Sequence, residues 1–258
     1  MIGRYEAYMD GTALSSIDDK ILVLDIKYTP ATVQRKTERL ANRPGARAYG
    51  KTIGSAQAVI TFEIHEYDTV KRQEICDKIT AWANGMYLRT SDKAWKRMRC
   101  VCDKYPSVQS KKWTEPVTMT FSAYNPPFWQ DMNPVVLTLG GTSGATSGSG
   151  SVFVPGNAED SLVSVTVTAK AGISSLSLTA NGNTFSFSGL SLSSGDTVTI
   201  GYDDDLMLSI KKGNTSIMGK RAASSADDLK VNCGKSNAFS FTADGAAVVT
   251  FSARGWWY

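Results

Sequence analysis

The sequence predicts a mainly β protein with two domains: an N-terminal β-sandwich-like domain that carries one packed α-helix and a long arm, and a C-terminal antiparallel β-sandwich. Short stretches of alternating apolar and polar residues recur along most of the chain, and such alternation is typical of half-buried strands. The length of 258 residues suits two modest domains. Nearly all the surplus Lys and Arg precedes residue 132, and the later part is rich in Ser, Thr and Gly. We therefore expect domains at 1–132 and 133–258.

The first clear strand is expected at Ile21–Tyr28, and a long segment, Thr29–Gly54, follows it. This segment has few apolar residues, and a compact domain rarely keeps so long a loop without a purpose. It is interpreted as a mobile solvated loop or as an arm that orders against a neighbouring subunit, with nucleic-acid binding as a third alternative. Its cations are the candidate subunit-interface residues: Arg35, Lys36, Arg39, Arg43, Arg47 and Lys51.

A strand followed by a helix is expected next. The strand is Ala58–Tyr67, and the helix begins after Asp68, a suitable N-cap, and stops at Gly85. Three apolar residues of this helix share one face: Ile75, Ile79 and Trp82. The pattern is that of a helix lying on a sheet.

Three further strands complete the first domain, at Met86–Arg89, Arg97–Tyr105 and Val117–Tyr124. The adjacent prolines that follow cannot continue a hydrogen-bonded ladder. The stretch Gly140–Ser151 is rich in Gly, Ser and Thr, and we expect it to be a linker or a long loop.

The second domain is expected to contain about eight short antiparallel strands. Their apolar residues alternate with polar ones: Val163/Val165/Val167, Leu176/Leu178, Phe185/Phe187, Val198/Ile200, Leu206/Leu208/Ile210, Phe239/Phe241 and Val249/Phe251. Turn signals separate them: Asn181–Asn183, Ser194–Asp196, Asp203–Asp205, Lys212–Asn214 and Asp244–Gly245.

We predict no catalytic, cofactor-binding or metal-binding residues. His65 is the one histidine of the chain, and it alternates with Glu63 on the less apolar face of its strand. A wall hydrolase built on these two residues is an alternative. Asp203–Asp205 is predicted to be a solvated hairpin tip, because consecutive residues do not direct their oxygens at one calcium ion. The closing Trp256, Trp257 and Tyr258 are expected to form a packed edge instead of a platform for sugars.

The four cysteines, Cys76, Cys100, Cys102 and Cys233, are predicted to be buried free thiols, with a metal site or a disulfide as alternatives. Zinc sites usually have cysteines at paired C-x-x-C spacings, which this set lacks. A net charge of +4 is low for a dedicated nucleic-acid binder of this length. The N-terminus has no secretory signal and no apolar run is long enough to span a bilayer, so we expect synthesis in a cytoplasm and no membrane association.

The order of these elements resembles a known family. The matching features are the strand Leu22–Tyr28 before the arm, Val59–Tyr67 leading into the helix Thr69–Asn84, Tyr87–Arg89, Met98–Tyr105, Val117–Tyr124 closing on Asn125–Trp129, Val154–Ala158 before Leu162–Thr168, Val231–Asn237 before Phe239–Phe241, and Val248–Tyr258. Together they look like the distal tail protein family of long-tailed (siphovirus-like) bacteriophages and prophage-derived tail particles. The second half resembles the galectin-like C-terminal sandwich of that family.

The resemblance implies a structural subunit of a phage tail tip or baseplate. It would form a homohexameric ring between the tail tube protein and the tail-associated hub protein, with the tape measure and receptor-binding proteins as further partners. It implies no cofactor and no specific nucleic-acid binding, although DNA would pass through the ring. The chain would be made and assembled in the host bacterial cytoplasm and end at the virion tail tip. The alternative function is a carbohydrate-binding module that acts through the C-terminal sandwich.

Overall fold

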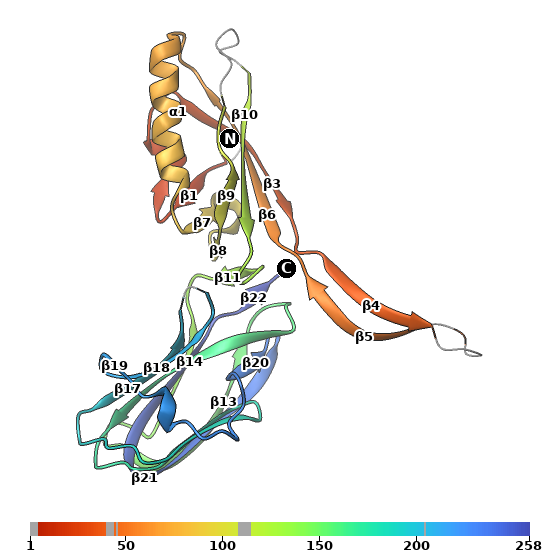
Figure 1. The fold of residues 1–258 in the computed structure, drawn as a ribbon. Coiled ribbons are helices and arrows are strands. Elements are labelled where there is room, and N and C mark those ends of the chain that lie inside the picture. The colour runs from red at the N-terminus through yellow and green to blue at the C-terminus, as the bar shows by residue number, and fades with distance from the viewer. Residues whose placement is uncertain (1–4, 40–43, 45, 108–114, 204) are drawn as a thin grey trace. The chain divides into compact units, whose positions relative to one another are not determined.

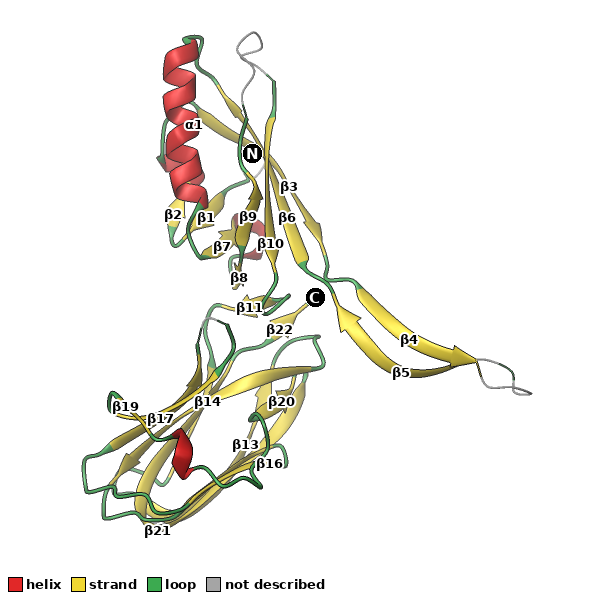
Figure 2. Ribbon diagram, viewed as in Figure 1, coloured by secondary structure: helices red, strands yellow, loops and turns green. Residues whose placement is uncertain are grey.

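The computed structural model describes residues 5–39, 44, 46–107, 115–203 and 205–258 (Figure 1). The chain separates into two compact units: an N-terminal unit of residues 1–130 with Tyr258, and a C-terminal unit of residues 131–257. Strands dominate both units, and α1 (Thr69–Ala83) is the one α-helix of the described residues (Figure 2). The expectation of a mainly β fold with one helix is confirmed. The predicted boundary after residue 132 and the galectin-like character of the second domain stay predictions.

A four-stranded antiparallel sheet forms the middle of the N-terminal unit. Its order is β3 (Ile21–Thr29), β6 (Ala56–Ile64), β10 (Val117–Ala123) and β9 (Val101–Lys104). Every second residue of β6 is buried, from Ala56 to Ile64. This sheet therefore turns one apolar face inward, as the alternation in the sequence predicted.

A second sheet of the N-terminal unit includes three strands that sequence reasoning missed: β1 (Ala7–Met9), β2 (Thr12–Ala13) and β11 (Trp129–Asp131). Its order runs β2, β1, β7 (Tyr87–Thr90) and β8 (Lys96–Arg99), with β11 beside β8. The short 3-10 helices η1 (Leu14–Ser16) and η2 (Ser91–Lys93) follow β2 and β7.

The predicted strand Arg97–Tyr105 is wrong as a single strand. It breaks at Cys100, so that β8 belongs to one sheet and β9 to the other. The Cys100 amide instead donates to the Met86 carbonyl oxygen, at 3.0 Å. The passage of the chain from one sheet to the other depends on tertiary contacts, which the local alternation of apolar and polar residues does not reveal.

Helix α1 is bounded as predicted. The Asp68 carboxylate accepts hydrogen bonds from the amides of Val70 and Lys71, the usual contacts of an N-cap. At the other end Asn84 is the C-cap and Gly85 follows it. A Cβ on Gly85 would lie 2.2 Å from Cγ of Met9, so this glycine also lets the helix end pack closely on β1. Several residues of the inner face are buried: Arg72, Ile75, Cys76, Ile79 and Ala83.

One long strand organises the C-terminal unit. β21 spans Lys235–Ala253, and its partner on one side changes along its length. Its first part pairs with β15 (Leu176–Ala180), and its second part pairs with β14 (Asp160–Ala169). The prediction of two strands separated by a turn at Asp244–Gly245 is therefore wrong. These residues lie inside the strand, where a Cβ on Gly245 would meet the Gly172 carbonyl oxygen at 2.0 Å.

The strands of the C-terminal unit form two layers joined through β21. In one layer β16 (Asn183–Phe187) and β15 lie beside the first part of β21. In the other, β14, β17 (Thr197–Tyr202) and β18 (Leu208–Lys212) lie beside its second part. Between the layers is an apolar core that includes Leu178, Phe185, Phe241 and Phe251.

The predicted linker at Gly140–Ser151 is wrong. Most of it belongs to β13 (Ala145–Val154), which continues the line of β12 (Val135–Leu139) along the other side of β21. Gly148 and Gly150 are the inward positions of β13. A Cβ on Gly148 would lie 2.8 Å from the Phe241 ring, and one on Gly150 would lie 3.3 Å from Leu137 and Leu139. The glycines leave room for these side chains.

A strap of residues 217–229 links the two layers along their outer edges. It follows β18 and the short β19 (Thr215–Ser216), includes η3 (Met218–Lys220), and leads into β20 (Lys230–Asn232). Ala222 and Ala226 donate backbone hydrogen bonds to Ser186 and Thr184 of β16. β20 then pairs with the start of β14. The last strand, β22, is Trp256–Trp257.

Candidate functional site

The predicted arm is a two-stranded antiparallel ribbon. β4 (Val33–Arg39) pairs with β5 (Ala46–Ile53), and Figure 1 shows both continuing outward beyond the ends of β3 and β6. The ribbon is closed at its root by a 2.8 Å hydrogen bond from the Gly54 amide to the Thr32 carbonyl oxygen. Every residue of β4 and all of β5 except Ile53 are exposed. The segment therefore forms two paired strands in place of the loop that one interpretation expected, and its role as an arm that orders against a neighbouring subunit stays a prediction.

Five of the six candidate interface residues lie on this ribbon. Arg35, Lys36 and Arg39 belong to β4, and Arg47 and Lys51 belong to β5. Arg43, the sixth, lies outside the described residues.

The strand register brings like charges together on the ribbon. Arg35 lies directly opposite Lys51, and Arg39, four residues further along β4, shares their face. Glu38, the one acidic residue of these two strands, faces Arg47. Like charges in directly opposed positions destabilise an antiparallel pair. A two-stranded hairpin alone is also marginally stable in water. The register therefore gathers positive charge on one face of an exposed ribbon.

The root of the arm is held by a cluster around Tyr28, at the end of β3. Its hydroxyl group hydrogen bonds with Asp92, at 2.5 Å, and Thr90, at 2.7 Å. The Lys93 ammonium lies 3.5 Å from the centre of the Tyr28 ring and 4.8 Å from that of Trp129. Burial raises the pKa of Tyr28, and burial also lowers the pKa of Lys93. The cluster thus ties the end of β3, where the arm begins, to residues that follow β7 and to β11 of the second sheet.

A second charged surface, which sequence reasoning missed, lies at one end of the C-terminal unit. We call it the acidic end. Its described carboxylates come from the start of β14, the β17–β18 tip and the strap: Glu159, Asp160, Asp203, Asp205, Asp227 and Asp228. The signal that could have found it is the recurrence of adjacent acidic residues at three separate places in the sequence.

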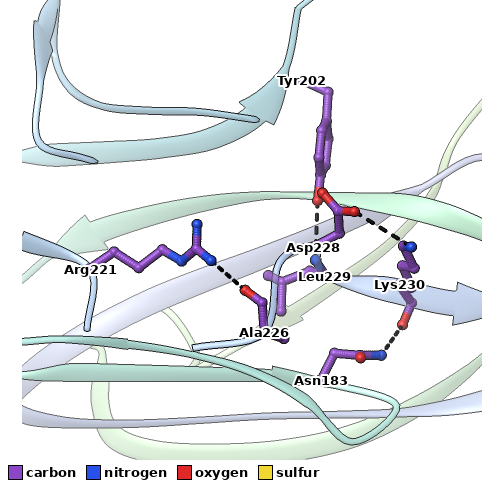
Figure 3. Close-up of polar contacts among 7 residues, drawn as sticks. All are labelled: Asn183, Tyr202, Arg221, Ala226, Asp228, Leu229 and Lys230. Carbon is purple, nitrogen blue, oxygen red and sulfur yellow. Dashed lines mark hydrogen bonds and ion pairs between the residues drawn. The ribbon is translucent and has the colours of Figure 1, made fainter. Parts of the chain in front are cut away.

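Three hydrogen bonds and one ion pair hold the strap in place beside the acidic end (Figure 3). The Tyr202 hydroxyl oxygen accepts from the Leu229 amide at 3.1 Å, and Asp228 pairs with Lys230 at 3.5 Å. The Asn183 amide group donates to the Lys230 carbonyl oxygen at 3.3 Å, and the Arg221 guanidinium donates to the Ala226 carbonyl oxygen at 2.6 Å. Because these contacts fix the strap, the carboxylates beside it stay gathered at one end of the unit.

Asp203 is part of the tip between β17 and β18. Its carboxylate accepts hydrogen bonds from the amides of Asp205 and Met207, so it stabilises the turn itself. The prediction of a hairpin tip at this position is confirmed, while Asp204 lies outside the described residues. Over the part of the chain that is described, no group of three or more His, Cys, Asp or Glu side chains is placed to hold a metal ion.

His65 and Glu63 lie 2.7 Å apart, between Nε2 and Oε2, on an exposed face of the N-terminal unit. The structure thus joins the two residues considered for hydrolysis in a surface pair. All four cysteines are buried and free, as predicted. Burial raises the pKa of Cys100 to about 12 and that of Cys102 to about 11, which makes both poor nucleophiles because the thiolate is the reactive form.

The closing aromatic residues are packed. The Trp256 carbonyl oxygen accepts from the amides of Asn157 and Ala158, and Trp257 Nε1 donates to the Asp131 carboxylate at 2.8 Å. This agrees with the expectation of a packed edge. No helix in the described ranges combines the length and apolarity that a membrane span needs.

Comparison with solved structures relates this fold to phage tail proteins. The Dit protein of phage SPP1, described as a paradigm of the hub adsorption apparatus in phages that infect Gram-positive bacteria, superposes with a TM-score of 0.68 at 11% identity, over 97% of this chain and 98% of that one. The chain has the fold of a phage distal tail protein. A chain of the phage P2 baseplate, activated with Ca, gives a TM-score of 0.54 at 10% identity, covering 99% and 98%. The same baseplate with Sr gives 0.53 at 10%, covering 97% of each chain.

The likeness to the distal tail fold extends over both units. The sequence itself is remote: no family model matches it, and no curated protein matches it. At such low identity the likeness concerns the fold, and the resemblance inferred from the order of elements is confirmed at that level.

Proposed function

We propose that this chain is a structural subunit of a phage tail tip or baseplate, where six copies form a ring that joins the tail tube to the hub and adhesion devices. The observation that carries the proposal is the likeness to the SPP1 Dit protein over nearly the whole of both chains, which includes both units. A match to one unit alone would have indicated a shared domain only.

The arm supports the ring in particular. A closed ring of identical copies needs a heterologous interface, in which one surface contacts a different surface of the next copy. The exposed ribbon of β4 and β5 provides one such surface. We therefore assign the subunit interface to its basic residues, and the domains 1–132 and 133–258 to ring closure and to outward docking, respectively.

The partners follow from this position. They are the tail tube protein on one side of the ring, the hub protein on the other, and the tape measure and receptor-binding proteins around them. The site of action would be the virion tail tip, after assembly in the host cytoplasm. We propose no catalytic role and no cofactor.

Sugar binding by the C-terminal unit is less well supported. Of the large apolar residues that are clearly exposed in the described part of this unit, one is aromatic, Phe153. Sugar-binding sites commonly stack rings on exposed aromatic side chains. We therefore keep the structural ring as the proposal.

The test is the solution mass of the full chain, measured by light scattering over a range of concentrations. Six copies of a 27.9 kDa chain have a mass of roughly 170 kDa, and a closed ring stops growing at a fixed size. A discrete sixfold mass is expected. A chain that stays monomeric at every concentration would contradict a ring formed by this protein alone.

A further inference from the structure

The outward face of the sheet formed by β1, β7 and β8 gathers arginine and tyrosine side chains (Figure 1). We call it the Arg–Tyr face, and its residues are Tyr8, Tyr87, Arg89, Arg97 and Arg99. We propose that this face binds an acidic segment of a partner protein, whose carboxylates pair with the guanidinium groups. The inference goes beyond the proposed function, because it concerns a surface other than the arm and does not depend on a ring.

The strand register places the five side chains together. Tyr8 of β1 lies opposite Arg89 of β7, and Tyr87 of β7 lies opposite Arg99 of β8. Arg97 is two residues from Arg99 and therefore shares its face. All five are partly exposed, whereas the residues that alternate with them are buried on the inner face. The sequence thus sets one polar side of this sheet apart for Arg and Tyr alone.

The three arginines of this face have few partners of their own. They form no ion pair with any described residue. Each guanidinium has five N–H donors, yet the hydrogen bond they make within the described residues is from Arg99 Nη1 to the Asn125 carbonyl oxygen, at 3.1 Å. Arg97 Nε is buried and has no acceptor. The face therefore presents positive charge and donors that an acidic ligand can satisfy.

The two carboxylates that flank β1 do not neutralise this charge. Glu6 accepts hydrogen bonds from the amides of Ala7 and Ser15, at 3.0 and 3.3 Å. Asp10 accepts from the amides of Met86 and Tyr87, at 2.8 and 2.9 Å. Both carboxylates are thus directed at the backbone of turns and strand ends, and neither forms an ion pair with the arginines of the Arg–Tyr face.

The tyrosine rings hold two of the arginines in position. The guanidinium carbon of Arg89 lies 4.3 Å from the centre of the Tyr8 ring, and that of Arg97 lies 4.0 Å from the centre of the Tyr87 ring. A guanidinium that lies over an aromatic ring keeps its N–H edge for a carboxylate. Because these side chains are already ordered on a sheet, binding an acidic group costs less conformational entropy.

The same stacking distinguishes between two classes of anionic partner. Single-stranded nucleic acids bind to sheets by stacking their bases on aromatic side chains. Here one side of the Tyr8 ring and one side of the Tyr87 ring are covered by guanidinium groups. Carboxylates need no ring surface and pair with guanidinium groups through two parallel hydrogen bonds. The favoured ligand is therefore an acidic polypeptide segment.

The experiment measures the binding of a fluorescent decaglutamate peptide to the full-length chain by fluorescence anisotropy. A decaglutamine peptide is the uncharged probe, and a deoxythymidine decamer is the nucleic-acid probe. We expect decaglutamate to bind most tightly of the three, with an affinity that falls as the salt concentration rises. The face variant carries Arg89→Gln, Arg97→Gln and Arg99→Gln. It is expected to bind decaglutamate at least about tenfold more weakly than the wild type.

Two further variants separate a built site from net charge. The arm variant carries Arg35→Gln, Arg39→Gln and Arg47→Gln, which removes the same charge from β4 and β5. It is expected to bind decaglutamate within about threefold of the wild type, because the arm has no aromatic rings beneath its arginines to order them. The ring variant, Tyr8→Leu with Tyr87→Leu, keeps every charge. It is expected to bind about threefold to tenfold more weakly, because two arginines lose their support.

Circular dichroism and light scattering on each variant keep the outcomes distinct. If the face variant binds decaglutamate like the wild type, or the arm variant loses as much affinity, the proposal is wrong. If the face variant is unfolded, its three substitutions are measured singly, and the proposal is wrong unless at least one weakens binding.

Other occupants of the face give different results. Tighter binding of the deoxythymidine decamer through the same arginines would replace the acidic peptide with a nucleic acid. Loss of the wild-type oligomer mass in a folded face variant would show that a second copy covers the face, which also overturns the proposal. A wild type that stays monomeric and binds decaglutamate through this face supports the inference and contradicts the ring alone.

Discussion

The glycines of β13 allow a sharp test of the C-terminal unit. Gly148→Val adds a branched side chain at an inward position, where the first added atom alone would lie 2.8 Å from the Phe241 ring and 3.2 Å from Leu139. Ser149→Val adds a similar side chain one residue later, at an exposed position of the same strand. The two changes differ mainly in the face of the sheet that receives the new atoms.

The expected size of the effect follows from two opposing terms. Overpacking a core typically costs about 1–3 kcal/mol, whereas replacing glycine within a strand returns about 0.5–1 kcal/mol of backbone entropy. The net loss at Gly148 is therefore between about 0 and 2.5 kcal/mol, with a central value of about 1 kcal/mol. A loss of about 1 kcal/mol lowers Tm by about 2–8 °C. Ser149→Val is expected to change stability by less than about 0.5 kcal/mol, as surface substitutions usually do.

Differential scanning calorimetry on the wild type and both variants measures the difference. We expect one transition to fall in temperature in the Gly148 variant and to stay in place in the Ser149 variant. If residues 140–151 were a linker, neither substitution would matter. Equal transition temperatures in the two variants would therefore refute the placement of β13 in the core.

Two further predictions concern single carboxylates. Asp68→Ala removes the N-cap of α1 and is expected to destabilise the N-terminal unit by about 1 kcal/mol in urea unfolding. Asp68→Asn keeps a capping oxygen and is expected to be close to the wild type in stability. An equal loss of stability in both variants would indicate that the charge of Asp68 matters instead of its capping hydrogen bonds. Asp244 accepts hydrogen bonds from the Ser174 hydroxyl and from the amides of Ser174 and Ser175, and the Ser174 side chain is the main cause of its low pKa of about 2. The stabilising effect of the Asp244 carboxylate is present above its unfolded pKa of about 3.9 and is lost as the pH falls towards 2. The difference in the free energy of unfolding between the wild type and Asp244→Asn should therefore shrink over that range. A difference that stays constant with pH would contradict this role.

Helix α1 could be predicted to its ends because every signal was local. Asp68 lies directly before it, Gly85 directly after it, and Ile75 and Ile79 fall one turn apart within it. The buried alternation of β6 and β14 was equally local. Such elements depend on neighbours a few residues away, which a sequence displays directly.

The incorrect predictions share one cause, which is contact between segments that lie far apart in the sequence. Gly148 and Gly150 have the composition of a flexible linker, yet they are small because Phe241, Leu137 and Leu139 fill the space beside them. Asp244–Gly245 has the composition of a turn, but it lies within β21, at the point where the register against β13 shifts and the partner on the other side changes from β15 to β14. In both cases a glycine serves close packing with a distant segment.

The two charged surfaces show the same contrast. The basic arm could be found from sequence because its cations lie within one segment. That the segment forms a ribbon could not, because its strands lack the apolar alternation by which strands are recognised. The acidic end could not be found, because its carboxylates come from three places that only the fold of β14, β17 and the strap brings together.

The charges of the arm are unfavourable for a ribbon that has no partner surface. A free-standing ribbon gains from opposite charges across its strands, and one pair, Glu38 with Arg47, has that form. The pair of Arg35 with Lys51 has the opposite form, and neither strand contributes a buried side chain that would compensate. We therefore expect a partner surface with negative charge to stabilise the ribbon, which would couple the stability of the arm to assembly of the proposed ring.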